Sequence, residues 1–234
     1  MRGIISRGGI IAKKAIFMFN FDDIPTLISR IFVLLTAFAV HEFAHAWTAD
    51  RFGDSTPRDN GRLTLNPMAH LDPMGSLMLI VVGFGWAKPV PVNPYALARR
   101  SSAAMMWVAL AGPASNFLMA LLASIPFQLG LVSQYGAFAN PGAILPSLDK
   151  LLWEFVTINL LLMLFNLIPL APLDGDKILY YLLPSSGQRV MDNIRPYGPM
   201  LLLVVVFSSF FLPFNLIGSI IGPPLAALTN LLTG

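Results

Sequence analysis

The chain has 234 residues, of which 56% are hydrophobic and only 12% are charged. A soluble domain carries about twice that share of charge and could not bury so much apolar surface. Intrinsic disorder is also excluded, because disordered chains are poor in apolar residues. Charge is unevenly distributed as well, since 101–148 and 196–234 contain no Asp, Glu, Lys or Arg. The composition therefore predicts an integral membrane protein built from helices of about 20 apolar residues.

The absence of cysteine limits the kinds of site that the chain can form. Disulfides and thiolate-bound metals are excluded, so a metal ion must bind to histidine and carboxylate side chains. The net charge is only +3, and the basic residues lie in the loops between apolar runs. This pattern fits orientation in a lipid bilayer and argues against nucleic acid as a partner.

In chain order, we expect an N-terminal interfacial segment over 1–23, one transmembrane domain over 24–222 and a C-terminal tail over 223–234. The first apolar helix should cover 24–49, because Pro25 suits a helix start and Phe52-Gly53 suits its end.

The second apolar run, 73–87, is short and contains three glycines. It predicts a short or re-entrant helix that is shielded by protein rather than by lipid. Before it, 62–65 is a candidate short strand. After it, 88–94 carries three prolines and should be extended.

Further apolar runs predict spans over 102–129, 149–170 and 197–221, the last interrupted by Pro213, with a short amphipathic helix over 177–183. The expected fold class is an all-α polytopic membrane protein. It has about four full transmembrane helices, one short or re-entrant apolar segment and a small extended or β element.

The loop charges predict an orientation. Six Lys and Arg residues lie in 51–100 and three lie in 174–195, whereas 130–148 has none. Positively charged loops stay in the cytoplasm, so we expect the first two loops there and the third outside. Both termini should then lie outside, but the basic residues of the N-terminal segment conflict with this, and its placement stays open.

Residues 41–45 read HEFAH, which is the pattern HExxH. On a helix, positions i and i+4 share one face, so His41 and His45 can reach one metal ion. Glu42 lies close enough to accept a proton from a zinc-bound water, whose pKa zinc lowers toward 7. The alternative is a helix end whose polar residues simply meet water. It is disfavoured because ten uncharged residues precede the motif.

Catalytic zinc needs a third protein ligand, here either His70 or a carboxylate. Asp174 is the best candidate, because Gly175 permits a turn and the predicted orientation brings it to the depth of the histidines. Asp174 could instead cap the following helix. The simpler interpretation of His70 is that it anchors its loop. Asn116, in an uncharged span, forms either an interhelical hydrogen bond or a contact with a substrate carbonyl or developing oxyanion.

Five segments within about 33–183 carry recognisable motifs. They are HEFAH at 41–45, LNP at 65–67 with HLDPMG at 70–75, GWAKPVPVNP at 85–94, AGPASN at 111–116 and NLIPLAPLDG at 166–175. Taken together, they resemble the site-2 proteases, a family of intramembrane zinc metalloproteases. The GWAKPVPVNP segment is most similar to the compact bacterial and archaeal branch, which lacks PDZ and nucleotide-binding modules.

The resemblance implies one zinc ion bound by His41, His45 and Asp174, with Glu42 as general base. It also implies that Asn116 contacts the substrate or the transition state. The substrates would be single-span membrane proteins or pre-cleaved stubs in a prokaryotic cell membrane, cut toward the cytoplasmic side. A regulatory membrane partner is consistent with this picture.

The chain departs from the resemblance after LDG, where the family often has a second Gly and an Arg. Here these are Asp176 and Lys177. Asp176, like His70, is a candidate for a supporting or regulatory role near the metal. Two other functions stay open: a catalytically silent metal-binding scaffold, and a metal-ion transporter. A transporter needs ligands along a path, whereas the candidates here form one cluster.

Overall fold

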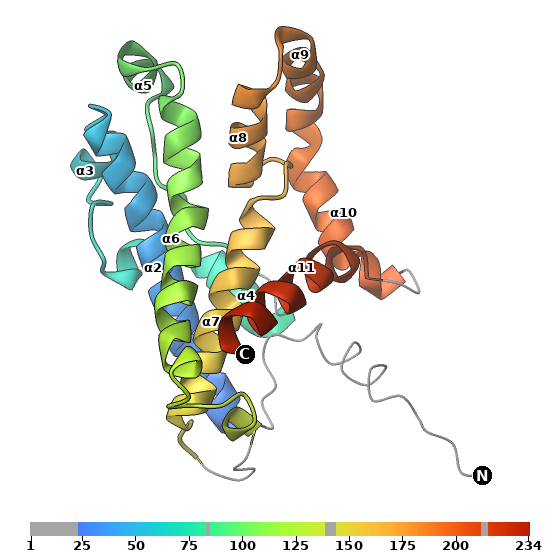
Figure 1. Ribbon diagram of the computed structural model, residues 1–234. Coiled ribbons are helices and arrows are strands. Elements are labelled where there is room, and N and C mark those ends of the chain that lie inside the picture. Colours follow the sequence, from blue (N-terminus) through green and yellow to red (C-terminus); the bar gives the residue numbers. More distant parts are fainter. Residues whose placement is uncertain (1–22, 83–84, 139–143, 212–214) are drawn as a thin grey trace.

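The computed structural model describes residues 23–82, 85–138, 144–211 and 215–234. The expected interfacial segment therefore lies outside the described residues, apart from Asp23. Three long helices, α2 (Ile24–Arg51), α6 (Ala104–Gln128) and α7 (Leu148–Asn166), pack side by side (Figure 1). The remaining elements are α3 (Thr56–Asp59), η1 (Pro67–Ala69), α4 (Pro73–Val82), α5 (Pro94–Arg100), η2 (Gly136–Phe138), α8 (Asp174–Leu182), α9 (Ser185–Ile194), η3 (Arg195–Tyr197), α10 (Gly198–Phe211) and α11 (Leu216–Thr233).

Apolar side chains on one face of each long helix hold the bundle together. Removing such side chains from contact with solvent or lipid and packing them closely is what fixes the distances between the helices. Fully buried side chains occur at all three contacts. They are Val33, Ala37 and Ile158 between α2 and α7, Ala120, Val156 and Leu160 between α6 and α7, and Ala49, Leu97 and Ala104 where α2, α5 and α6 meet.

The expected class, an all-α polytopic membrane protein, is confirmed in its coarse form. Among the described residues, four helical stretches are long and apolar enough to cross a membrane. They differ in part from the expected set, because α7 carries three charged residues and is not one of them, although it packs at the centre of the bundle. The four stretches are Ile24–Arg51, Ala104–Gln128, Ser185–Ser208 and Leu216–Thr233.

The residues expected as a C-terminal tail, 223–234, are helical as far as Thr233. The expected last span is divided into α10 and α11, and α11 continues through Pro223 and Pro224 to Thr233. Three of its leucines explain why it persists, because they pack against the buried cluster of α6 and α7. They are Leu225, Leu228 and Leu232.

The strand expected over 62–65 is also not formed. In the part of the chain that the structure describes, the β pairing is a single antiparallel bridge between Leu71 and Ala87. The side chain of Arg62, only 5% exposed, instead donates to the carbonyls of Ala69 and Lys88. The buried guanidinium thus supplies a donor to two backbone carbonyls of the loop.

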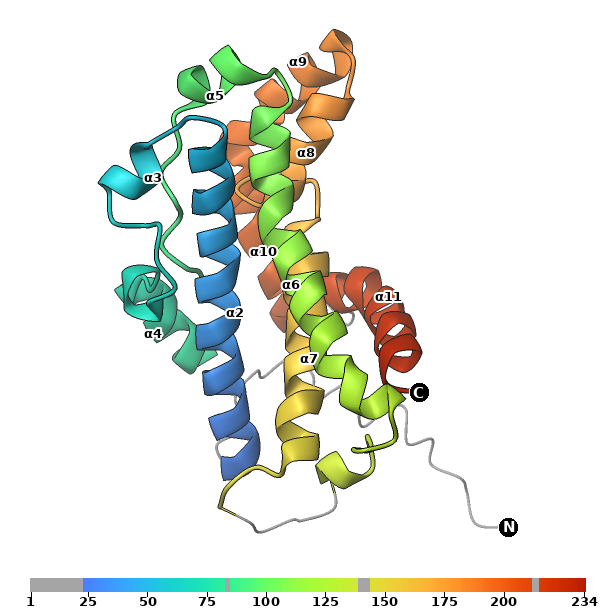
Figure 2. The same cartoon turned by 60° about the vertical axis from the view of Figure 1, so that its left-hand side comes forward.

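The connection from α2 to α5 spans 52–93 and includes α4. The end of α2 and the start of α5 lie at the same end of the bundle, whereas α4 lies part-way along α2 (Figure 2). The carboxylate of Asp54 joins the two ends of this connecting segment. One oxygen accepts from the backbone N–H of Thr56 at 3.0 Å and the other accepts from that of Asn93 at 2.6 Å. The residues from 88 to 93 are extended, as the prolines predicted.

Two ion pairs join α2 to α7 at the other end of the bundle. Arg30 Nε lies 3.0 Å from the buried carboxylate of Glu154, and Lys150 Nζ lies 3.0 Å from the more exposed carboxylate of Asp23. Burial raises the pKa of Asp23, but hydrogen bonds from Thr26 and Lys150 outweigh it and hold this pKa below its usual range. Both pairs fix the register of the two helices.

The Glu154→Leu variant should lower the free energy of unfolding by about 3 kcal/mol, because it removes the carboxylate that balances a partly buried guanidinium. The matched Lys150→Leu variant, which breaks the more exposed pair, should cost less than about 1 kcal/mol. Unfolding of the detergent-solubilised protein measures both. Equal losses of unfolding free energy in the two variants would show that the burial of Glu154 does not strengthen its ion pair.

Candidate metal centre

Helix α2 places two histidines one turn apart, facing α6. The Nε2 atoms of His41 and His45 lie 3.0 Å from each other, and the rings meet edge to face with centroids 4.6 Å apart. Gly112 of α6 makes this approach possible, because a Cβ atom there would lie 2.5 Å from His45 Cε1 and 2.6 Å from His41 Cε1. A side chain at this position would displace both rings.

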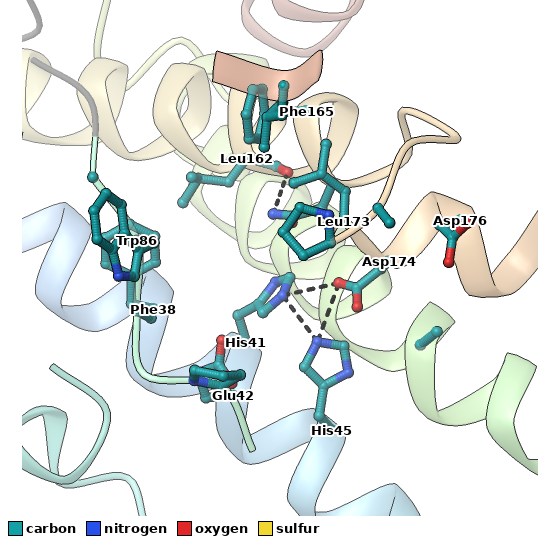
Figure 3. Close-up of a pocket in the computed structure, with 18 of the residues that line it drawn as sticks. Phe38, His41, Glu42, His45, Trp86, Leu162, Phe165, Leu173, Asp174 and Asp176 are labelled. Atoms are coloured by element: carbon teal, nitrogen blue, oxygen red, sulfur yellow. Dashed lines mark hydrogen bonds and ion pairs between the residues drawn. The ribbon is translucent and has the colours of Figure 1, made fainter. Parts of the chain in front are cut away.

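Asp174 reaches the histidines from the first turn of α8 (Figure 3). Its Oδ2 atom lies 3.2 Å from the Nε2 atoms of both His41 and His45. The helix cap is Leu173, without a side-chain hydrogen bond, so the alternative that Asp174 caps α8 is wrong. Gly175 packs against the carbonyls of Leu167 and Ile168, which leaves no room for a side chain.

The hydrogen bonds of the imidazoles identify which ring atoms are free. His45 Nδ1 lies 2.6 Å from the carbonyl oxygen of Val108, which can only accept, so Nδ1 carries the hydrogen. His41 Nδ1 lies 2.5 Å from Oδ1 of Asn116 and donates in the same way. In each neutral ring, Nε2 therefore presents a lone pair to the other ring and to Asp174.

Two lone pairs and a carboxylate oxygen at these distances repel one another unless a cation lies between them. Tetrahedral zinc with bonds of about 2.0–2.1 Å places neighbouring ligand atoms about 3.3 Å apart, close to the 3.0–3.2 Å found here. The three side chains thus fit a zinc ion.

A cavity of about 810 Å³ opens beside these ligands. Glu42 lines it next to His41 and is 9% exposed, so its carboxylate lies at the wall of the cavity rather than in bulk solvent. The other lining side chains are mostly apolar. They include Phe38, Trp86, Val90, Leu162, Phe165 and Leu202.

The side chain of Asn116 forms the interhelical hydrogen bonds that were one of its two expected roles. It is fully buried, and both ends of its amide form hydrogen bonds, with His41 at 2.5 Å and with Asn159 at 2.9 Å. This placement favours the interhelical hydrogen bond over direct contact with a substrate.

The two residues that depart from the family pattern after LDG form ion pairs. Lys177 Nζ lies 3.4 Å from Oδ1 of Asp174, the oxygen that faces away from the histidines. Asp176 lines the cavity but binds Arg195, whose Nε lies 3.0 Å and 3.2 Å from its two oxygens. Asp176 thus ties α8 to η3, and Figure 3 shows it apart from the three ligands.

His70 is buried in the loop before α4, and its Nε2 donates to the carbonyl of Thr64 at 2.8 Å. Its own carbonyl accepts from the backbone N–H of Lys88 at 2.8 Å. Among the described residues, the group able to hold a metal consists of His41, His45 and Asp174. His70 has the anchoring role that was the simpler of its two interpretations.

Sequence reasoning missed three residues of the site. Gly112 and Asn166 appeared only within the segments that carry the resemblance, and Asn159 received no role. In the structure Gly112 faces both histidines, Asn159 bonds to Asn116, and Asn166 lines the cavity from the end of α7. The signal for both asparagines was available, since each is an amide in an otherwise apolar run.

Comparison with curated proteins identifies the family. Over 175 residues the chain is 41% identical to the Bacillus subtilis (strain 168) protein named "Putative zinc metalloprotease YwhC", with 75% of this chain and 78% of that protein aligned. The chain belongs to this zinc metalloprotease family.

Two mycobacterial relatives, both named "Putative zinc metalloprotease Rip2", extend the comparison. Identity is 32% over 185 residues with the Mycolicibacterium smegmatis protein, covering 74% of this chain and 64% of the relative. It is 29% over 196 residues with the Mycobacterium tuberculosis H37Rv protein, covering 77% and 69%. No family model and no solved structure matches the chain. The protein is thus a membrane zinc metalloprotease, a hydrolase that acts on peptide bonds with zinc as its cofactor.

Gly112→Val should weaken zinc binding on the order of 100-fold, because the new side chain displaces both imidazoles and misplaced ligands lose affinity. Zinc content after dialysis against a graded chelator series measures this. Ala114→Val, which creates the same side chain at an exposed position of α6, is the control. Unchanged zinc content in Gly112→Val would mean that the histidines do not bind the metal.

Proposed function

We propose that the protein is an intramembrane zinc metalloendopeptidase of the site-2 protease type, which cleaves transmembrane segments of membrane proteins. The observation that carries this proposal is the depth of the ligand cluster. His41 lies ten residues before the end of α2, about 15 Å along the helix axis. The bilayer core is about 30 Å thick, so the scissile bond would be cut well inside it.

In the proposed mechanism, His41, His45 and Asp174 hold the zinc ion, which supplies Lewis acidity to a water molecule and to the scissile carbonyl. Glu42 accepts a proton from the attacking water at its carboxylate and later returns it to the leaving nitrogen. Lys177 balances the second oxygen of Asp174, so this carboxylate keeps its position while charge shifts beside it.

The cavity suits an apolar segment of extended chain. A transmembrane helix must unwind locally before one of its peptide bonds is accessible, and its freed backbone groups then need partners. The extended chain near Val90 lines the cavity and is the segment we propose for β pairing with the opened substrate. In this proposal 52–93 enters the membrane from the cytoplasmic side and returns to it, with α4 as the re-entrant helix.

The two alternative functions are less well supported. A transporter needs ligands distributed along a path, whereas within the described residues the metal-binding candidates form one group on one side of a cavity. A silent scaffold has no need of Glu42 at the cavity wall. Regulation by a membrane partner is part of the proposal, as is a location in a prokaryotic cell membrane.

Glu42→Gln should lower the rate of cleavage by a factor on the order of 10²–10⁴, because the amide cannot accept the proton of water. Its zinc content should be unchanged. Substrates can be found by proteomics, as membrane stubs that accumulate in cells carrying this variant, and then tested with the reconstituted protein. Asp50→Asn, the same change at the Arg58 ion pair of α2, is the matched control.

The outcomes separate the three functions. Cleavage by Glu42→Gln at the wild-type rate would exclude Glu42 as the base. Tight zinc binding without cleavage in the wild type would point to a scaffold, and zinc flux into vesicles would point to a transporter.

Single cysteines can test the orientation, because the natural chain has none. Tyr135→Cys lies at an 86% exposed position in 130–148, and Ser186→Cys lies at an exposed position of α9, toward the opposite end of the bundle. A membrane-impermeant maleimide should label Tyr135→Cys in intact cells and Ser186→Cys only after lysis. The reverse pattern would place the active site toward the outside.

A further inference from the structure

A line of buried amides connects His41 to α7. His41 Nδ1 lies 2.5 Å from Asn116 Oδ1, Asn116 Nδ2 donates to Asn159 Oδ1 at 2.9 Å, and Asn159 Nδ2 donates to the carbonyl of Phe155 at 2.8 Å. Both asparagines are fully buried. The relay therefore passes from α2 through α6 to α7 without reaching solvent.

The carbonyl of Phe155 fixes the direction of every hydrogen bond in this relay. A carbonyl oxygen can only accept, so the Asn159 atom that faces it must be the amide nitrogen. The oxygen of Asn159 then faces Asn116, which must donate with its own nitrogen. The oxygen of Asn116 is left facing His41, whose Nδ1 must carry the hydrogen.

This direction determines the metal-binding form of His41. With the hydrogen on Nδ1, the lone pair is on Nε2, the atom that lies 3.2 Å from Asp174 Oδ2. A flipped Asn159 would place its oxygen against the carbonyl oxygen of Phe155 and its amide nitrogen against that of Asn116. In a buried site such unmatched polar groups are costly. His45 has no such dependence, because the backbone carbonyl of Val108 orients its ring directly.

We propose that Asn159 is a positioning residue for zinc, acting through Asn116 to hold His41 in the Nδ1–H form with Nε2 aimed at the metal. The proposal rests on the proposed role of His41 as a zinc ligand. Partners of this kind orient ligand imidazoles, and losing them weakens metal affinity. Asn159 touches neither the metal ligand set nor the cavity, so its effect must pass through the relay.

The test compares two isosteric polar-to-apolar changes on α7 in the full, zinc-loaded chain. Asn159→Leu breaks the relay, whereas Thr157→Val removes a hydroxyl that is buried without a hydrogen-bond partner. Zinc affinity by chelator competition should fall about 10-fold in Asn159→Leu and stay at the wild-type value in Thr157→Val. Asn159→Asp, protonated because burial raises the pKa of its carboxyl, keeps both hydrogen bonds and should restore most of the affinity.

Nuclear magnetic resonance of ¹⁵N-labelled histidine gives a second readout, since the chain has only three histidines. In the wild type, His41 and His45 should show a hydrogen-bonded Nδ1–H, whereas His70 should carry its hydrogen on Nε2, which donates to Thr64. Asn159→Leu should move the Nδ1–H signal of His41 and leave that of His45 in place. A merely structural role of Asn159 would move neither selectively.

Each outcome decides between the proposals. Equal zinc affinity and an unchanged His41 signal in Asn159→Leu would overturn the relay. Should that variant fail to accumulate, the wild-type spectrum still decides, because a His41 ring without a hydrogen on Nδ1 contradicts the relay. If His41→Ala loses zinc while Asn159→Leu retains it, only the relay is wrong. If His41→Ala also retains zinc, the proposed metal site itself is wrong.

Discussion

Two imidazole lone pairs and a carboxylate oxygen point at one another, 3.0–3.2 Å apart, in the interior of an apolar helix bundle. Without a cation this arrangement is repulsive, and the side chains would relax apart if their helices allowed it. Much of the surrounding structure prevents that relaxation. Close packing of α2, α6 and α7 sets the helix distances, while glycines at 112 and 175 leave room for the two imidazoles and for the carbonyls of Leu167 and Ile168. The zinc site is thus held by backbone and packing as much as by its own ligands.

Several charged side chains in the bundle pair at helix junctions, whereas two carboxylates lie at the cavity. Arg30, Glu154, Asp23 and Lys150 pair at one end of the bundle, where α2 and α7 begin. Asp176 and Arg195 fasten α8 to η3 beyond the ligands. The chain is poor in charge, and these residues are used at helix junctions. The carboxylates of Glu42 and Asp174 are left at the cavity.

Much of the site could be predicted because its signals are local. The spacing of His41 and His45 fixes their common face through helix geometry alone, and the lack of cysteine reduced the third ligand to a few candidates. The choice between Asp174 as ligand and as helix cap could not be made from the sequence, because both roles suit an aspartate at a helix start. Tertiary structure decided it. The relay through Asn116 and Asn159 joins residues 43 positions apart, and no local pattern contains that pairing.

The fold was predicted less completely, and for a physical reason. Pro223 and Pro224 are strong local signals for a break, yet α11 runs through them because its leucines pack against α6 and α7. Likewise, 62–65 has the composition of a strand, but in the folded chain Arg62 is buried and donates to the distant carbonyls of Ala69 and Lys88. In both places long-range packing outweighs local preference.

The bare backbone of Gly112 also bears on how members of this family are classified. HExxH and LDG supply every ligand atom, but neither motif records whether the helix opposite the histidines leaves room for them. A relative could keep both motifs and, through one methyl group on α6, lose the space in which the metal sits. Such a chain would be counted as a protease by its motifs while being a metal-free membrane protein, so the residue at position 112 carries information that the two motifs lack.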